Sequence, residues 1–366
     1  MAMNRLNQSQ RSHFVDDLVY LVLESSDHWW PGDLARLAQV SSAWLGPVRQ
    51  RLFAFPIVHS FRASTRLART FSDNPSLITL VKGVELRPLP VDGRPVDSQD
   101  RASLNMILGI DGLKRIILGG LLSVRAERFL HRITDAQSVL NLHIDGSLMA
   151  NSISLADCPS FNWDESLAFQ FCNLKSLHLN DIELTISHPP IPYQLSLSEL
   201  QFDHVAFTRG YITQLLHETP YLRHLRVKST QTSELDEQIR CVLDSCAVEI
   251  LEIEVDVEGQ FEHPIFDNPS PSLRSLTLTG VHVDIDTLTS IGIYCQNLEN
   301  LAISGRMVAI VTSEWVSFIA SGHLPHLRDL ELPWATNSHS SEGSNCSVAD
   351  RLIQAANLRG IHFHLE

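Results

Sequence analysis

Apolar residues recur along most of this chain at one spacing, in which a first apolar position is followed by a second three residues later and a third two residues after that. Leu273, Leu276 and Leu278 form one copy, and the next copy begins 25 residues further on, at Leu298. Because alternate residues of a strand point to the same side, the last two positions of each copy predict a short strand with one buried face. The eleven copies begin at Val81, Leu113, Val139, Leu174, Leu197, Leu222, Val248, Leu273, Leu298, Leu327 and Leu358.

The segments between these copies carry apolar residues at helical spacing, as Leu288 and Ile291 do. Strand and helix in alternation predict an α/β solenoid with a parallel sheet on one side and helices on the other. No single unit can bury its apolar strand alone, so the units stabilise one another. Residues 76–366 therefore resemble the leucine-rich-repeat family, and the resemblance implies about 11 repeats with the sheet on the concave face and the helices outside.

Residues 12–60 lack this spacing and predict three short helices instead. We expect Phe14, Leu18, Leu21 and Val22 to form the apolar stripe of the first helix, and residues 61–75 to form a linker helix before the repeats. This region also contains Phe14-Val15-Asp16-Asp17-Leu18, then Pro31-Gly32-Asp33-Leu34, Leu37, Val40-Ser41 and Trp44. In these residues it resembles an F-box.

An F-box followed by repeats is the order found in F-box leucine-rich-repeat proteins, many of them fungal. The resemblance implies the substrate receptor of an SCF-type cullin ubiquitin ligase, in which the F-box docks onto a small Skp-type adaptor and the repeats hold a protein substrate. The alternative is a leucine-rich-repeat scaffold outside any ligase, whose degenerate F-box acts only as an N-terminal cap.

A helical region of about 45 residues buries little surface on its own, so we expect it to pack on a partner. Apolar and aromatic anchors dominate the energy of such contacts. Alternatively, the same side chains pack only against each other and the first repeat. The expected adaptor-binding residues are Leu18, Leu34, Leu37, Val40 and Trp44.

Strand geometry also predicts the residues that line the exposed face of the sheet. If the last two apolar positions of each copy point inwards, the residues that alternate with them point to the concave face, where a substrate would bind. The expected substrate-binding residues are His178, Asn180, Gln201, Asp203, His224, Arg226, Lys228, Glu252, Glu254 and Thr277.

One basic triplet on this predicted face, His224, Arg226 and Lys228, would suit a phosphorylated substrate, because Arg and Lys form charge-assisted bonds to phosphate oxygens. The parallel register places Arg226 next to Glu252, which favours ion pairs across the sheet instead. A basic peptide bound to the acidic stretch that begins at Glu249 is a third interpretation, although such a stretch is usually a solvated charged surface.

Charge and composition narrow the class of partner. The chain has 366 residues, 44% of them apolar, and a net charge of −14, so its field repels nucleic acid. Residues 1–75 carry eight basic against six acidic residues, +2, whereas the remainder carries 20 against 36, −16. No stretch is apolar enough to span a membrane, and the first residues lack the apolar run of a signal peptide, so we expect a cytoplasmic or nuclear protein with no membrane partner.

The sequence contains no HExxH, GxxxxGK[ST], GxGxxG or GxSxG motif. Its six cysteines lie far apart, without a CxxC pair, which fits neither a disulfide framework nor a zinc module. We therefore expect a protein that is not an enzyme and that holds no catalytic site, cofactor or metal, with any catalysis left to its partners.

Overall fold

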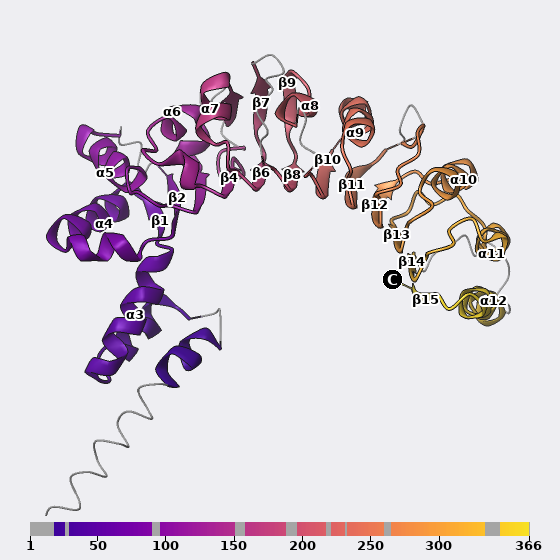
Figure 1. The fold of residues 1–366 in the computed structure, drawn as a ribbon, viewed down its shortest axis with the longest axis horizontal. Helices are drawn as coiled ribbons and strands as arrows, with labels where there is room; N and C mark the ends of the chain where they lie inside the picture. The colour runs from indigo at the N-terminus through magenta and orange to yellow at the C-terminus, as the bar shows by residue number, and fades with distance from the viewer. Residues whose placement is uncertain are drawn as a thin grey trace, which may run out of the picture. The chain divides into compact units, whose positions relative to one another are not determined.

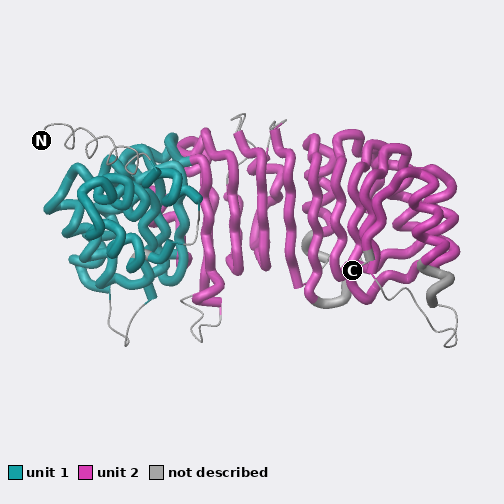
Figure 2. The backbone as a smooth tube through the Cα atoms, turned by 90° about the horizontal axis from the view of Figure 1, so that it is seen from below, with its two compact units in different colours: residues 1–122, 132–139 teal, residues 123–131, 140–366 magenta. Residues whose placement is uncertain are grey.

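The computed structural model describes residues 18–25, 29–89, 96–150, 158–187, 196–216, 221–230, 233–259, 265–333 and 345–365. The chain divides into two compact units, residues 1–122 with 132–139 and residues 123–131 with 140–366 (Figure 2). The predicted F-box region and linker helix both fall in the first unit. Within the described ranges, no helix has the length and apolar character needed to cross a bilayer.

The first unit begins with a small helical bundle. Residues 18–24 are helical and are followed by α2 (Pro31–Leu37) and α3 (Ser42–Ala54). The bundle is held together by Val19, Leu23, Leu34 and Val48, all of them buried. The expected stripe was therefore wrong for the described part of the first helix, because Leu18, Leu21 and Val22 are exposed and Val19 and Leu23 face the core. Residues 18–23 are almost all apolar, so their periodicity does not select one side; Phe14 lies outside the described residues.

The rest of the first unit contains three parallel strands in the order β1-β2-β3. Val58 pairs with Leu86, and Leu86 pairs with Leu118, so that one buried row crosses all three strands. The strand β1 was not predicted, and the predicted linker helix corresponds to α4. The elements are β1 (Ile57–Ser60), α4 (Phe61–Asp73), η1 (Pro75–Leu80), β2 (Gly83–Leu89), α5 (Ser98–Leu108), β3 (Arg115–Gly119), η2 (Gly120–Ser123) and η3 (Ala136–Ser138).

Nine parallel strands form the main sheet of the second unit, each beside the next in chain order. Within the second unit these nine strands form an open sheet and not a closed barrel. The nine strands are β4 (Asn141–Asp145), β6 (Ser176–Asn180), β8 (Glu199–Asp203), β10 (His224–Ser229), β11 (Ile250–Gly259), β12 (Ser275–Val281), β13 (Asn300–Ser304), β14 (Asp329–Leu332) and β15 (His362–Leu365).

The apolar positions that defined the sequence pattern line up across these strands. Leu225 pairs with Leu200 on one side and with Leu251 on the other, and the same row continues through Leu276 and Leu301. All five side chains are buried. The expected parallel arrangement of strands with one buried face is therefore confirmed for this part of the chain, and each strand shelters the apolar side chains of its neighbours.

Helices cover the buried side of this sheet, along the outer side of the second unit (Figure 1). Trp315 and Phe318 on α11 are typical, since both are buried while the residues between them are not. The helices are α6 (Glu127–Leu130), α7 (Glu165–Gln170), α8 (Ile212–Leu215), α9 (Ser233–Ser245), α10 (Ile285–Tyr294), α11 (Thr312–Ser321) and α12 (Asn345–Leu358).

A second, three-stranded parallel sheet was not predicted. It consists of β5 (Ser160–Trp163), β7 (Glu183–Ile186) and β9 (Ala206–Arg209), in that order. Phe161 and Trp163 bury their rings on one side of β5 and meet edge to face, with ring centroids 5.6 Å apart. Short strands thus accompany helices between the main strands of these repeats.

The last copy of the apolar pattern was assigned two residues too early. The predicted first position, Leu358, is 83% exposed, because α12 continues to this residue. Gly360, with φ of 70°, then turns the chain, and Phe363 is the residue that pairs with Leu330 on β14. The left-handed glycine that ends the helix adds residues between helix and strand, so the strand begins later than the apolar spacing predicts.

Candidate functional site

The exposed side of the second unit's sheet carries the residues that the sequence pattern assigned to substrate binding. All ten side chains are half-exposed, whereas the apolar residues that alternate with them are buried. The parallel register aligns them in rows across the strands. One row contains His178, Gln201, Arg226, Glu252 and Thr277, and the next contains Asn180, Asp203, Lys228 and Glu254.

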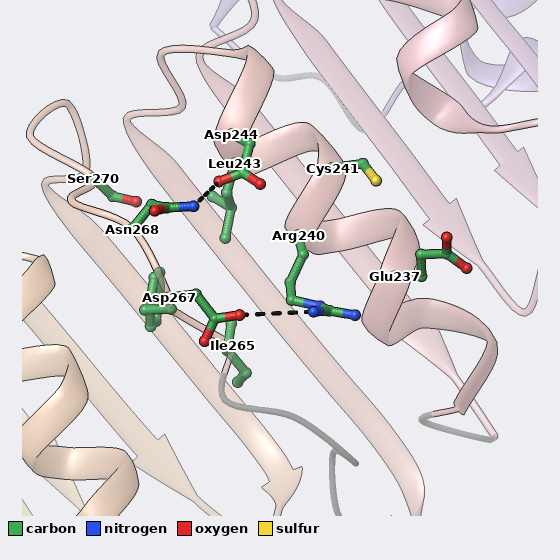
Figure 3. Close-up of a pocket in the computed structure, with 10 residues that line it drawn as sticks. Glu237, Arg240, Cys241, Leu243, Asp244, Ile265, Asp267, Asn268 and Ser270 are labelled. Carbon is green, nitrogen blue, oxygen red and sulfur yellow. Dashed lines mark hydrogen bonds and ion pairs between the residues drawn. The ribbon is translucent and has the colours of Figure 1, made fainter.

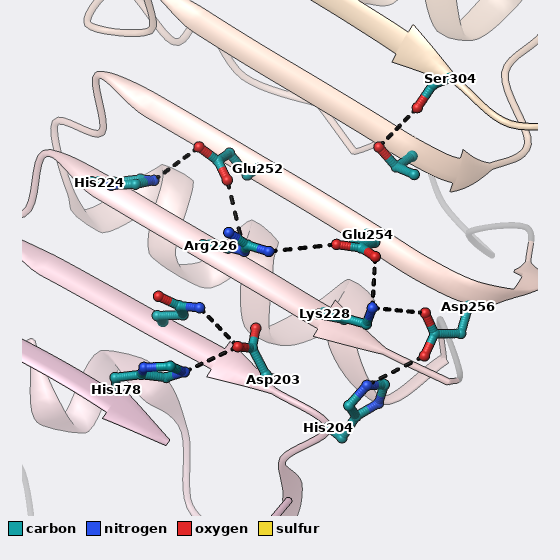
Figure 4. Close-up of polar contacts among 12 residues, drawn as sticks. His178, Asp203, His204, His224, Arg226, Lys228, Glu252, Glu254, Asp256 and Ser304 are labelled. Atoms are coloured by element: carbon teal, nitrogen blue, oxygen red, sulfur yellow. Dashed lines mark hydrogen bonds and ion pairs between the residues drawn. The ribbon is translucent and has the colours of Figure 1, made fainter. Parts of the chain in front are cut away.

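The two cations of this face, Arg226 and Lys228, both form ion pairs with carboxylates of β11 (Figure 4). Arg226 lies 3.8 Å from Glu252 and 3.6 Å from Glu254, measured between guanidinium nitrogens and carboxylate oxygens. The Nζ atom of Lys228 lies 2.7 Å from Oε1 of Glu254 and 3.1 Å from Oδ1 of Asp256. Hydrogen bonds to these two carboxylates raise the pKa of Lys228. The predicted ion pairs across the sheet are confirmed.

Three histidines also face carboxylates on this surface (Figure 4). His178 Nε2 lies 3.0 Å from Asp203 Oδ2, and His224 Nε2 lies 3.3 Å from Glu252 Oε1. The third is His204, whose Nε2 atom lies 3.3 Å from Asp256 Oδ2. Sequence reasoning missed His204 because it follows β8 in a left-handed conformation, with φ of 53°, instead of continuing the strand. Protonation of such a histidine adds a positive charge beside each carboxylate.

Asp203 and Asp181 show how crowded the carboxylates are near the ends of β6 and β8. Burial raises the pKa of Asp203, but hydrogen bonds from His178 and Gln201 outweigh it, and the pKa is lowered. Burial raises the pKa of Asp181; His204 opposes this, while the charges of Asp145 and Asp203 add to it. Asp145 is itself buried and accepts a hydrogen bond from Asn180 Nδ2 at 2.9 Å.

The two strands that follow β11 carry no charged side chain on this face. On β12 and β13 the residues that point outwards are small and polar or apolar, and the hydroxyls of Thr279 and Ser304 lie 3.0 Å apart (Figure 4). The next strand, β14, carries Asp329 and Glu331 on the same face, so the charged residues of β8, β10 and β11 form a separate group. We call it the charged face, and it consists of Glu199, Asp203, His204, His224, Arg226, Lys228, Glu252, Glu254 and Asp256, with His178 beside Asp203.

The five predicted adaptor-binding residues divide between the interior and the surface of the N-terminal helices. Leu34 is 4% exposed and belongs to the bundle core, and Leu37 and Trp44 are half-buried against that core. Leu18 and Val40 are exposed, Val40 by 66%. Five further apolar or aromatic residues of these helices are exposed but were not predicted as adaptor-binding: Tyr20, Leu21, Val22, Trp30 and Leu45. Trp30 had a signal in the sequence, because it stands directly after Trp29.

A small pocket lies on the helical side of the second unit, between α9 and residues 265–270 (Figure 3). Its volume is about 250 Å³. Arg240 crosses it to reach Asp267, with 3.6 Å between guanidinium nitrogen and carboxylate oxygen, and Asn268 donates a hydrogen bond of 2.9 Å to Asp244. These four lining side chains are therefore engaged in pairs, and none of the residues predicted from the sequence lines the pocket.

A metal site would need a cluster of ligating side chains, and a nucleophilic site could use a reactive thiol. Among the residues that the structure describes, no group of three or more His, Cys, Asp or Glu side chains is arranged to hold a metal ion. Cys158, Cys172, Cys241, Cys246 and Cys295 are free thiols. Burial raises the pKa of Cys246 to about 11 and that of Cys295 to about 12, which makes both poor nucleophiles.

Comparison of the sequence with protein-family models and with curated proteins finds no match. The described residues provide two surfaces of opposite character: exposed apolar side chains on the N-terminal helices of the first unit, and a polar, charged sheet face in the second.

Proposed function

We propose that this chain is the substrate receptor of an SCF-type ubiquitin ligase, in which the N-terminal helices bind a Skp-type adaptor and the sheet of the second unit binds a protein substrate. Catalysis belongs to the partners, and the receptor contributes proximity by holding the substrate near the conjugating enzyme. The proposal combines the sequence resemblance with the two surfaces described above.

The observation that carries the proposal is the exposure of large apolar side chains on the small N-terminal bundle. Trp30 is 75% exposed and Val40 66%, and Leu18 and Leu21 are exposed beside a core cluster in which the described residues include four buried apolar side chains. Exposed aromatic and aliphatic side chains that gather on one small element are typical of a protein-binding surface. Burying them on an adaptor would also add to the limited core of this bundle.

The sheet of the second unit suits a protein substrate for a different reason. Its strands are in register over many repeats, so its outward side chains form continuous rows instead of a closed cavity. An open row of polar side chains on a rigid sheet favours contact with an extended or flat partner surface over a small molecule.

A pull-down with purified Skp-type adaptor tests the adaptor contact. The double variant Leu18→Asp with Val40→Asp places charges on two exposed positions without entering the bundle core, and we expect it to lose adaptor binding. Leu358→Asp is the matched control, since Leu358 is also exposed and apolar but lies on α12 of the second unit, and this variant is expected to bind like the parent.

The alternative function, a scaffold whose N-terminal helices act only as a cap, is favoured by one observation. Leu34 is buried in the bundle, and Leu37 and Trp44 pack against the same core, so three of the five predicted adaptor residues already have intramolecular contacts. If the intact chain binds no adaptor in the same pull-down, the scaffold is the better description and the receptor proposal fails.

A further inference from the structure

The charged face has more carboxylates than cations. Its acidic residues are Glu199, Asp203, Glu252, Glu254 and Asp256, and its Arg and Lys residues are Arg226 and Lys228, which gives a charge of −3 while the histidines are neutral. The neighbouring strand β12 adds no charge, because its outward residues are Ser275, Thr277 and Thr279. A surface potential of this sign attracts cations and repels anions over about one Debye length, ~8 Å at physiological ionic strength.

Both cations are already engaged by two carboxylates each. Arg226 bridges Glu252 and Glu254, and Lys228 bridges Glu254 and Asp256. A phosphate would have to displace these carboxylates and approach the remaining ones, at the cost of like-charge repulsion. The basic triplet His224, Arg226 and Lys228 is therefore not available to an anion, and a phosphorylated substrate is less favoured than a basic one.

The carboxylates, in contrast, remain accessible. The side chains of Glu199, Glu252, Glu254 and Asp256 are between 33% and 46% exposed. A carboxylate can accept several hydrogen bonds through its two oxygens, so each retains capacity for a further donor beside its present partner. Ile250, exposed at the start of the strand that carries Glu252 and Glu254, adds an apolar contact beside His224.

We infer that the charged face binds an extended, Lys- or Arg-rich segment of a protein. This inference rests on the proposed function and specifies the substrate class of the same sheet. Four neighbouring strands, β6 to β11, span about 14 Å at ~4.8 Å per strand, which an extended segment covers with about four residues. Charge complementarity selects a basic protein segment, and it excludes nucleic acid and anionic membrane surfaces, since both are repelled by the same carboxylates.

The first test uses the unmodified full chain and needs no adaptor. Fluorescence anisotropy is measured with a labelled peptide of about eight residues in which Lys and Ser alternate, with a matched Glu-Ser peptide, and with a phosphoserine-Gly peptide. We expect binding of the Lys peptide that weakens as salt is raised, and no binding of the other two. Binding of the phosphoserine or Glu peptide in preference to the Lys peptide would overturn the inference, as would the absence of any preference.

The second test removes one positive charge from the charged face and measures whether the affinity for the Lys peptide rises or falls. Lys228→Gln removes one positive partner from Glu254 and Asp256, which keep Arg226 and His204 beside them. We therefore expect about a threefold gain in affinity for the Lys peptide, within the range of single exposed ion pairs. The control Lys175→Gln removes the same charge at an exposed position before β6 and should change the affinity little. A phosphate-binding face would respond to Lys228→Gln with a loss of affinity for the phosphoserine peptide instead.

Neutralising a carboxylate should act in the opposite direction. Glu252→Gln is expected to weaken binding of the Lys peptide by about two- to fivefold, while Glu165→Gln, an exposed change on α7, serves as the control. Equal effects of the two variants would contradict the proposed surface. Because these measurements contain no adaptor, a chain that binds adaptor but not the peptide disproves this inference alone, and a chain that binds peptide but not adaptor disproves only the ligase assignment.

Discussion

The Nζ atom of Lys228 on β10 lies 2.7 Å from Oε1 of Glu254, the residue beside it in the parallel register of β11. Asp256, two residues further along β11, accepts a second contact at 3.1 Å. The same lateral geometry joins Arg226 to Glu252 and Glu254. Charged side chains on this sheet are therefore paired mainly between neighbouring strands. Each strand shelters the apolar side chains of the next strand on the buried face, and on the exposed face it neutralises part of the next strand's charge.

The pairing of Lys228 predicts slow acylation of its amine. The chain has four lysines, and Lys82, Lys114 and Lys175 are exposed. Because the two carboxylates raise the pKa of Lys228 and occupy its ammonium group, an N-hydroxysuccinimide ester should modify it last, as read by peptide mass spectrometry. Glu254→Gln should speed the reaction at Lys228 alone. Equal rates at all four lysines would show that the pair does not persist in solution.

The buried rows of the sheet predict a large difference between two adjacent residues of β12. Leu278 is fully buried and Thr277 points to the opposite side. Leu278→Ala should lower the free energy of unfolding by about 2–5 kcal/mol, through lost burial and the cavity left behind. Thr277→Ala should change it by about 0.5 kcal/mol or less. Urea denaturation followed by circular dichroism measures both, and similar losses would mean that the alternation of faces is wrong.

The lowered pKa of Asp203 predicts a pH-dependent contribution to stability. Since the folded-state pKa lies below the ordinary 3.8, ionised Asp203 stabilises the fold at pH values above about 4, and this contribution is lost as the pH falls through the folded value. Asp203→Asn should therefore unfold at lower urea concentration than the parent at about pH 7, and the difference should shrink towards about pH 2. A difference that is constant over this range would assign the effect to packing.

Burial of the thiols predicts selective alkylation. With pKa values of about 12 and about 11, Cys295 and Cys246 carry almost no thiolate near neutral pH. Native protein treated with iodoacetamide should thus keep both unmodified while half-buried Cys172 reacts, and all three should react after unfolding in urea. Rapid native modification of Cys295 would indicate that its repeat opens in solution.

The strands of the sheet could be predicted because two constraints act on the same residues. Leu276 and Leu278 must alternate with polar positions to bury one face, and they must recur at the spacing that stacks one unit on the next. The same two constraints place Arg226 beside Glu252 from the sequence alone, and the register of β10 and β11 confirms this pairing. In a parallel sheet with uniform register, the spacing of the repeat is enough to predict which residues of adjacent strands lie side by side.

The remaining features could not be predicted for equally physical reasons. In residues 18–23 nearly every side chain is apolar, so tertiary packing alone decides that Val19 and Leu23, and not Leu21 and Val22, face the core. His204 joins the charged face through a left-handed turn that no apolar spacing encodes. The strands β5 and β7 alternate buried and more exposed residues over only four positions each, a length at which chance matches are common, and β9 has no buried residue at all.

A bridging assay tests the central claim of a receptor with two binding surfaces most directly. Immobilised Skp-type adaptor is incubated with the full chain and the labelled Lys-Ser peptide, and the retained peptide is measured. We predict retention that requires the chain, is lost with Leu18→Asp and Val40→Asp together, and is reduced by Glu252→Gln although the chain itself stays bound. An adaptor surface that retains neither the chain nor the peptide would contradict the receptor assignment.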